Sequence, residues 1–174
     1  MTGLSDLKQP DNYPDEFDVV VEIPQGSSSK IELDGESGAF KLDRVLHSPM
    51  FYPCSYGFVP STHYLDGDPV DVCLVSTAKL FPGLVVRCRA IGVLPMKDEA
   101  GVDNKVLAVP LDGVDPRMVE VRSVDDLPSH FRDELALFFS DYKKLEKGKQ
   151  EFVKVESWQG VEEALKILQE ALKK

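Results

Sequence analysis

Short apolar runs alternate with turn-forming residues along the first two thirds of the chain. The runs are rich in β-branched and aromatic residues, and Gly, Pro or Asp bounds each of them. Such runs are typical of β-strands, and many short strands in succession favour a barrel. The predicted strands span residues 17–23, 30–33, 39–42, 70–75, 84–94 and 105–109.

The hydrophobic period changes in the last third of the chain. Apolar residues recur there at helical intervals, at Phe131, Leu135, Phe138, Phe139, Tyr142 and Leu145. Pro128 near the start and Gly148 just past the end are residues that favour helix boundaries. A short strand over residues 152–155 and a second amphipathic helix over residues 161–172 follow. Strands first and helices later predict an α+β fold in one domain spanning residues 1–174.

The composition fits one domain outside the membrane. The chain has 174 residues, 43% of them hydrophobic, which is enough to bury one core. The longest apolar runs, at residues 17–21 and 90–94, are far shorter than the roughly 20 residues that cross a bilayer. Residues 1–12 are polar and lack the apolar stretch of a secretory signal, so we expect a cytoplasmic protein.

Charge and cysteine content argue against two further classes of protein. The net charge of −10 repels nucleic acid, and the basic residues are dispersed. Cys54, Cys73 and Cys88 cannot all pair and form no C-x-x-C motif, so we expect reduced structural thiols. An acidic protein can still bind an anion where metal ions bridge the two.

The densest chemical signal is the segment D-G-D-P-V-D-V at residues 66–72, which leads into an apolar strand. A hairpin turn with solvated acids explains Asp66 and the glycine after it, but leaves Asp68 and Asp71 unexplained. Because Pro69 restricts the backbone between them, the carboxylates can be held converging on a divalent cation. A calcium loop of the EF-hand type does not fit, since its glycine and glutamate positions are not matched.

A second acidic cluster, at residues 98–105, lies beside another strand. By itself it is equally consistent with a charged, exposed hairpin loop. Oxygen ligands without adjacent Cys or His favour a hard cation such as Mg²⁺ or Mn²⁺. Together, the two clusters could hold several Mg²⁺ ions while Lys105 attracts an anionic substrate, which is the combination that multi-metal phosphoryl chemistry needs.

A series of short motifs runs in order along nearly the whole chain. The segment from Asp66 to Val72 has the form D-x-D-P-x-D-x. The other motifs are Glu22-Ile23-Pro24, Lys30-x-Glu32, Phe51-Tyr52-Pro53, Tyr56-Gly57, Arg87-Cys88-Arg89, Asp98-Glu99-Ala100-Gly101, Asp103-x-Lys105, Phe138-Phe139 and Tyr142-Lys143. With these motifs the chain resembles the soluble family I inorganic pyrophosphatases, most closely their bacterial short form.

The resemblance implies a five-stranded, OB-like β-barrel flanked by the two main C-terminal helices, with a cleft at the mouth of the barrel. The implied metal ligands are Glu32, Asp66, Asp71, Asp98 and Asp103. The implied contacts to pyrophosphate come from Lys30, Arg44, Tyr56, Lys105, Tyr142 and Lys143. Asp68 is the implied general base and Tyr56 lies near the nucleophile, while Glu22 and Tyr52 lie behind the metal ligands, where Glu22 supports metal-bound water.

The implied activity is hydrolysis of pyrophosphate to two orthophosphates. A water held and activated between Mg²⁺ ions loses its proton toward Asp68, while Lys, Arg and Tyr groups stabilise the leaving phosphate. Several Mg²⁺ ions per site are implied, with Mn²⁺ or Zn²⁺ as substitutes. A homo-oligomer is also implied, with a hexamer favoured, although Leu137 and Asp141 stand where some relatives carry interface histidines.

Two other functions stay open at this point. One is hydrolysis of another phosphoanhydride such as a nucleotide, which the lack of a P-loop or G-x-G-x-x-G motif disfavours. The other is cation binding or assembly without catalysis, which predicts metal binding but no turnover of any phosphoanhydride.

Overall fold

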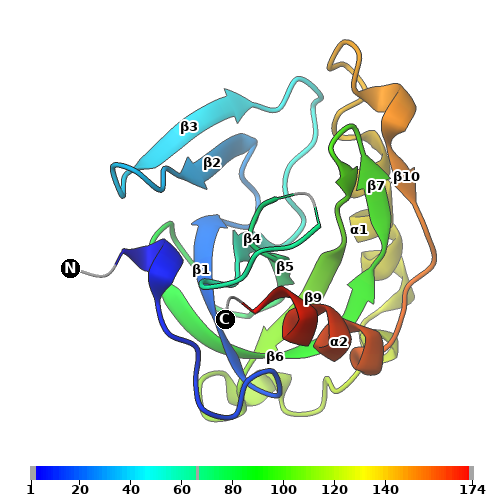
Figure 1. Ribbon diagram of the computed structural model, residues 1–174. Helices are drawn as coiled ribbons and strands as arrows, with labels where there is room; N and C mark the ends of the chain where they lie inside the picture. Colours follow the sequence, from blue (N-terminus) through cyan, green and yellow to red (C-terminus); the bar gives the residue numbers. More distant parts are fainter. Residues whose placement is uncertain (1–2, 66, 173–174) are drawn as a thin grey trace.

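A closed barrel of five strands forms the centre of the protein in the computed structural model, which describes residues 3–65 and 67–172 (Figure 1). Around the barrel the order is β1 (Phe17–Ile23), β4 (Ser55–Phe58), β5 (Asp71–Leu74), β9 (Lys105–Pro110) and β6 (Val85–Leu94), which returns to β1. Neighbouring strands are antiparallel except β5 and β9, which pair in parallel. The predicted five-stranded barrel is confirmed.

Two smaller sheets lie outside the barrel. Strands β2 (Ser29–Leu33) and β3 (Phe40–Val45) form an antiparallel hairpin. Strands β7 (Met96–Asp98), β8 (Gly101–Val102) and β10 (Lys154–Val155) form a three-stranded sheet. In Figure 1 the hairpin and the three-stranded sheet stand on opposite sides of the upper end of the barrel.

Two α-helices complete the fold, as predicted. Helix α1 (Ser129–Asp141) buries Leu135, Phe138 and Phe139, and α2 (Val161–Ala171) packs along β6 through Ala164, Ile167, Leu168 and Ala171. Short 3₁₀ turns occur at Leu4–Asp6, Pro116–Met118, Val124–Asp126 and Gln150–Phe152. Within the described residues, no helix is long and apolar enough to cross a membrane. The three cysteines are buried and unpaired, as expected.

Strand β4 is a barrel strand that the sequence pattern does not predict. Its four residues are all buried, so it has no alternation of apolar and polar positions. Gly57 allows β4 to approach β1, because a Cβ atom at this position would lie 2.0 Å from the Val20 carbonyl oxygen. Two of the predicted strands, at residues 30–33 and 39–42, instead form the hairpin outside the barrel. Alternation predicts a strand without saying which sheet it joins.

The long helix ends earlier than predicted, at Asp141. The chain continues in turns, since the N–H groups of Lys144 and Glu146 donate to carbonyls three residues earlier, at 2.9 and 2.8 Å. Leu145, which the pattern places on the buried face of the helix, is 61% exposed. The turns instead carry the side chains of Lys143 and Glu146 inward, where both are buried against partners of opposite charge.

Candidate active site

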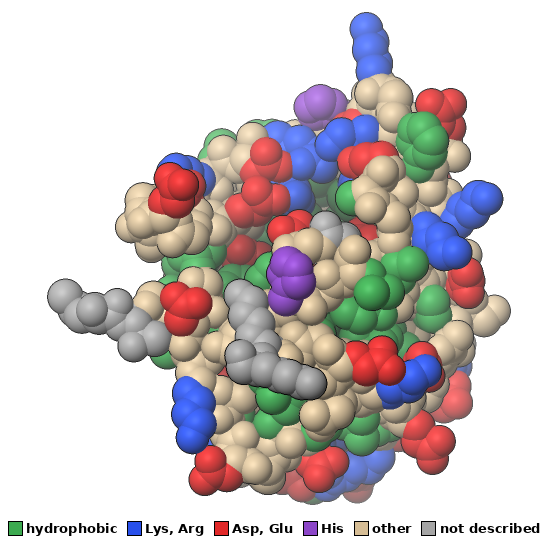
Figure 2. Space-filling model, viewed as in Figure 1, with side chains coloured by type: hydrophobic (Ala, Val, Ile, Leu, Met, Phe, Trp, Pro, Cys, Tyr) green, Lys and Arg blue, Asp and Glu red, His purple; other side chains and the backbone are tan. Residues whose placement is uncertain are grey.

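A cleft of about 390 Å³ opens between the β2–β3 hairpin and the mouth of the barrel. Its lining includes six of the predicted site residues, namely Glu22, Lys30, Glu32, Tyr56, Asp68 and Asp71. Figure 2 shows acidic and basic side chains gathered around a hollow on the same face of the molecule. Asp66 lies outside the described residues.

Parallel pairing of β5 and β9 brings the two acidic clusters together. Val72 pairs with Val106, so the residues that precede them, Asp71 and Lys105, lie side by side at the start of the two strands. The Lys105 Nζ atom is 2.6 Å from Asp71 Oδ2 and also donates to Asp103, two residues away along the chain. The side chain of Lys105 is only 3% exposed, so its ammonium group is shielded from water, whereas Asp71 is 24% exposed toward the cleft.

Burial and the shared lysine pull the pKa values of these acids apart. Burial raises the pKa of Asp71, but Lys105 and the hydrogen bonds with Tyr56 and Asp103 together outweigh burial, so it lies below its usual value. Burial raises the pKa of Asp103 to about 7, even though Lys105 opposes the rise. Burial lowers the pKa of Lys105, and the two aspartates reverse this and raise it well above its usual value. The lysine is therefore charged at neutral pH while Asp103 is partly protonated.

A layer of aromatic rings supports the cleft from the side of α1. The Tyr52 ring lies 4.7 Å from Phe138 and 5.6 Å from Tyr56, and Phe138 stacks on Tyr142 at 5.1 Å. Lys105 Nζ lies 5.6 Å from the centre of the Tyr56 ring, and the Tyr56 hydroxyl shares a hydrogen bond with Asp71. Burial raises the pKa of Tyr142 to about 12, so its hydroxyl stays protonated and can donate a hydrogen bond at neutral pH.

Lys143 and Asp98 form a second ion pair, beside the three-stranded sheet. Lys143 Nζ is 2.7 Å from Asp98 Oδ2 and 3.0 Å from Glu99 Oε2. The lysine follows the end of α1 and the acids lie at the β7–β8 turn, so the pair joins two elements. Burial raises the pKa of Asp98, but the hydrogen bonds from Lys143 and the Ala100 N–H, together with the charges of Lys143 and Lys105, outweigh burial and lower it below its usual value, so Asp98 is ionised at neutral pH.

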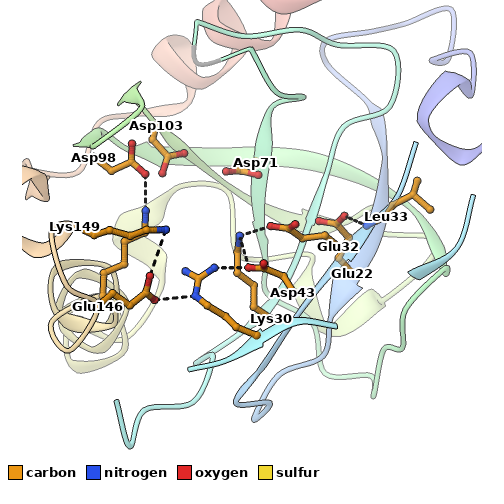
Figure 3. A network of polar contacts seen from close by, with 12 residues as sticks. Glu22, Lys30, Glu32, Leu33, Asp43, Asp71, Asp98, Asp103, Glu146 and Lys149 are labelled. Atoms are coloured by element: carbon orange, nitrogen blue, oxygen red, sulfur yellow. Dashed lines mark hydrogen bonds and ion pairs between the residues drawn. The ribbon is translucent and has the colours of Figure 1, made fainter. Parts of the chain in front are cut away.

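The hairpin carries a third group of charges. Lys30 Nζ donates to Glu32 and lies 3.7 Å from Asp43 Oδ2, and Asp43 also pairs with Arg44. On neighbouring β1, Glu22 Oε1 accepts a hydrogen bond of 2.7 Å from the backbone N–H of Leu33, and burial raises the Glu22 pKa to about 7. In Figure 3, Asp71 lies between Glu22 and Glu32 on one side and Asp98 and Asp103 on the other.

Three further charged residues join these groups and were not singled out by the sequence. Asp43 bridges Lys30 and Arg44, Glu146 accepts from Arg44, and Lys149 lies 3.5 Å from Glu146 and 3.2 Å from Glu99. The sequence signal is weak, because a short stretch rich in lysine and glutamate after a helix usually describes a solvated surface.

The carboxylates of the site fit a hard divalent cation in their chemistry. Lys105 already holds carboxylate oxygens of Asp71 and Asp103 close together, and the pKa of about 7 at Asp103 reflects its burial first and the nearby charge of Asp71 second. Across residues 3–65 and 67–172, three or more His, Cys, Asp or Glu side chains do not converge closely enough to form a ready-made metal site. Lys105 supplies positive charge between the two aspartates.

A barrel whose mouth gathers facing carboxylates and cations is the arrangement that phosphohydrolases use for small polyanions. The family model of inorganic pyrophosphatase matches residues 19–174. The inorganic pyrophosphatase of Aquifex pyrophilus is 45% identical over 98% of this chain and 95% of its own length. That of Thermoplasma volcanium is 49% identical over 94% of this chain and 96% of its own length.

Solved structures agree with the sequence comparison. The crystal structure of inorganic pyrophosphatase from Thermus thermophilus superimposes with a TM-score of 0.92 at 42% identity, covering 98% of this chain and 97% of that one. The chain belongs to the inorganic pyrophosphatase family.

Proposed function

We propose that the protein hydrolyses pyrophosphate to two orthophosphates in the cleft at the mouth of the barrel. Membership of the family supports the reaction, and one feature of the chain supports the place. This feature is Lys105, a buried cation that two aspartates from both acidic clusters share. Such a cation would attract the phosphate oxygens while the carboxylates recruit divalent metal.

The cations around the cleft bind the substrate in this proposal. Lys30, Arg44, Lys105 and Lys143 stand on four different segments, so they can contact a small anion from several sides. Tyr142 adds a hydroxyl donor, and Tyr56, whose own hydroxyl is hydrogen-bonded to Asp71, lines the cleft against the substrate. Because charge develops on the leaving phosphate during P–O cleavage, fixed donors that face it lower the barrier of the step.

Asp68 takes the proton of the attacking water. It lines the same cleft as Asp71 and Tyr56 and, unlike the buried Asp103, it is exposed, so a proton can leave it for solvent. Tyr56, on β4, lines the same cleft as Asp68. The hydrogen bond from the Tyr56 hydroxyl to Asp71 fixes the Tyr56 ring near the attacking water.

Mg²⁺ would be held by Glu32, Asp71, Asp98 and Asp103, together with Asp66. Bound Mg²⁺ supplies neutralisation of substrate charge and a lowered pKa for water. Glu22 accepts a hydrogen bond from the backbone of the hairpin that carries Glu32, so it fixes that ligand, and it would also support metal-bound water. Tyr52 packs between Tyr56 and Phe138 and holds the aromatic layer in place.

We also propose that the protein acts in the cytoplasm as a homohexamer. Exposed apolar side chains support association, since Phe51 is 60% and Leu137 55% exposed and both line one groove. Sedimentation velocity tests the assembly: a hexamer has six times the mass of the 19.4 kDa chain, and sedimentation as a monomer at micromolar concentration contradicts it.

Phosphate release by the purified protein tests the activity. The assay compares pyrophosphate, ATP and a phosphomonoester, each with Mg²⁺ and with Mg²⁺ plus excess chelator. We expect rapid release from pyrophosphate alone, abolished by chelator. Comparable release from ATP would favour a broader phosphoanhydride hydrolase, and release from none of the three by folded, metal-loaded protein would leave cation binding as the function.

A further inference from the structure

Glu146 is a buried acid beside the proposed active site that has no assigned role. It lies between two successive turns after α1, because its N–H donates to the Lys143 carbonyl at 2.8 Å and its own carbonyl accepts from Lys149 N–H at 3.3 Å. Its side chain is 5% exposed, although glutamate is among the residues least often buried. A buried carboxylate of this kind needs charged partners.

The partner of Glu146 is Arg44 of the hairpin. Glu146 Oε1 lies 2.9 Å from Arg44 Nε, and the two residues are 102 positions apart in sequence. Arg44 Nη1 pairs with Asp43, while Nη2 is buried and has no hydrogen-bond partner within the described part of the chain. Two of the three guanidinium nitrogens are thus held by the protein, and the third is left as a donor.

The same carboxylate also connects the β2–β3 hairpin with the segment after α1 and with the β7–β8 turn. Its Oε2 atom is 3.5 Å from Lys149 Nζ, which is 3.2 Å from Glu99 Oε1, and Glu99 in turn pairs with Lys143. Figure 3 shows Glu146 reaching toward Lys149 from the segment after α1. Because the hairpin is a separate sheet outside the barrel, the ion pair between Arg44 and Glu146 ties Arg44 to the segment that carries Lys143.

We infer that Glu146 is a positioning residue, which holds the Arg44 guanidinium in place so that its free nitrogen meets a phosphate oxygen of pyrophosphate. The inference rests on the proposed contact between Arg44 and the substrate. A guanidinium with one fixed edge loses less freedom when a phosphate binds its other edge, so the contact costs less to form.

A second physical effect of Glu146 has the opposite sign. As an acid it also reduces the positive charge that Arg44 offers to an anion. If neutralisation is its main effect, then removing the carboxylate tightens substrate binding. If positioning dominates, then removing it weakens binding, and only while Arg44 is present.

The test measures KM and kcat for pyrophosphate hydrolysis with Mg²⁺ in four variants and the unaltered protein. Glu146→Met removes charge and acceptor while filling the buried space, and it is made alone and together with Arg44→Ala. Arg44→Ala is also made alone. The matched control is Glu151→Met, at an exposed glutamate of the nearby 3₁₀ turn. Thermal unfolding of each variant is recorded in parallel.

We expect Glu146→Met to raise KM roughly tenfold, the size of one lost hydrogen bond to a charged group. Arg44→Ala should raise KM at least as much, the double variant should match Arg44→Ala alone, and Glu151→Met should leave both constants unchanged. An equal further rise in the Arg44→Ala background, or a KM that stays the same or falls, overturns the positioning role.

Two results separate this inference from the proposal on which it rests. If Arg44→Ala leaves KM unchanged, then Arg44 does not contact substrate, and both ideas are wrong. If Arg44→Ala raises KM but Glu146→Met does not, then only the role of Glu146 is wrong. If Glu146→Met fails to fold, then Glu146→Asp replaces it, because this variant keeps the charge but moves the carboxylate away from Arg44. The positioning role predicts a raised KM for Glu146→Asp, and an unchanged KM overturns that role.

Discussion

Lys105→Met removes the one positive charge that Asp71 and Asp103 share at the barrel mouth. Methionine has similar length and packs well against aromatic rings, so it can occupy the space beside Tyr56. What the substitution takes away is the ammonium group, 2.6 Å from Asp71 in a side chain that is 3% exposed. Two crowded carboxylates are left without their counter-charge.

The expected loss of stability follows from this burial. Removing one partner of a buried ion pair costs about 3–5 kcal/mol. The lower end applies here, because the pKa of about 7 at Asp103 means that one of the two acids can take up a proton near neutrality. For a chain of this size, a loss of about 3 kcal/mol lowers Tm by roughly 6–12 °C.

Thermal unfolding followed by circular dichroism, at one fixed protein concentration, measures the loss. The scan is run in chelator and again in Mg²⁺, and we expect Mg²⁺ to restore part of the Tm because a bound cation replaces the missing charge. Lys166→Met is the control, since Lys166 is 60% exposed on α2 and should change stability by less than about 0.5 kcal/mol. A Tm of Lys105→Met equal to that of the control would refute the reasoning.

Three further perturbations test other parts of the structure. Gly57→Ala places a Cβ atom 2.0 Å from the Val20 carbonyl oxygen, so denaturant unfolding should report a loss of about 3 kcal/mol or more, and a loss below 1 kcal/mol would contradict the contact. Burial raises the pKa of Asp115, but the hydrogen bonds from Thr77 and Arg117 together outweigh burial and lower the pKa from its ordinary 3.8 to about 2. The stability that ionised Asp115 contributes is therefore present above about pH 4 and lost as the pH falls toward 2. Asp115→Asn should be less stable than the parent at pH 7, and the difference in free energy of unfolding between them should shrink between about pH 4 and pH 2. A difference that does not change with pH would contradict the lowered pKa. Lys30→Ala should raise KM for pyrophosphate roughly tenfold, whereas Lys41→Ala on the same hairpin should leave KM unchanged. Equal effects of the two substitutions would mean that Lys30 only forms a surface ion pair and does not contact substrate.

The sequence predicts the local elements of this fold better than their partners. β1 runs from Phe17 to Ile23 as its apolar pattern indicates, and the amphipathic pattern at residues 161–172 gives α2 to within one residue. β4 is missed because a short, fully buried strand has no period to detect. The end of α1 is misplaced because side-chain ion pairs, which are tertiary contacts, turn Lys143 and Glu146 inward.

The candidate site shows the same division. The acidic motif identifies Asp68 and Asp71 as chemical groups, but their proximity to Lys105 depends on the parallel register of β5 and β9, which no local pattern encodes. The link from Arg44 to Glu146 spans 102 positions and lies between two polar segments, so hydrophobic periodicity carries no trace of it. Family resemblance names most of the site residues, whereas the supporting ion pairs require the folded chain.

Turnover of pyrophosphate by Asp71→Asn, measured beside the unaltered protein with saturating Mg²⁺, tests the central claim most directly. The claim is that the carboxylates at the mouth of the barrel carry out the hydrolysis, and Asp71 lies at their centre, in contact with Lys105 and Tyr56. The account predicts that kcat falls by at least about 100-fold while the circular dichroism spectrum stays that of the folded protein. Near-normal turnover by the folded variant would contradict it and place the reaction elsewhere on the molecule.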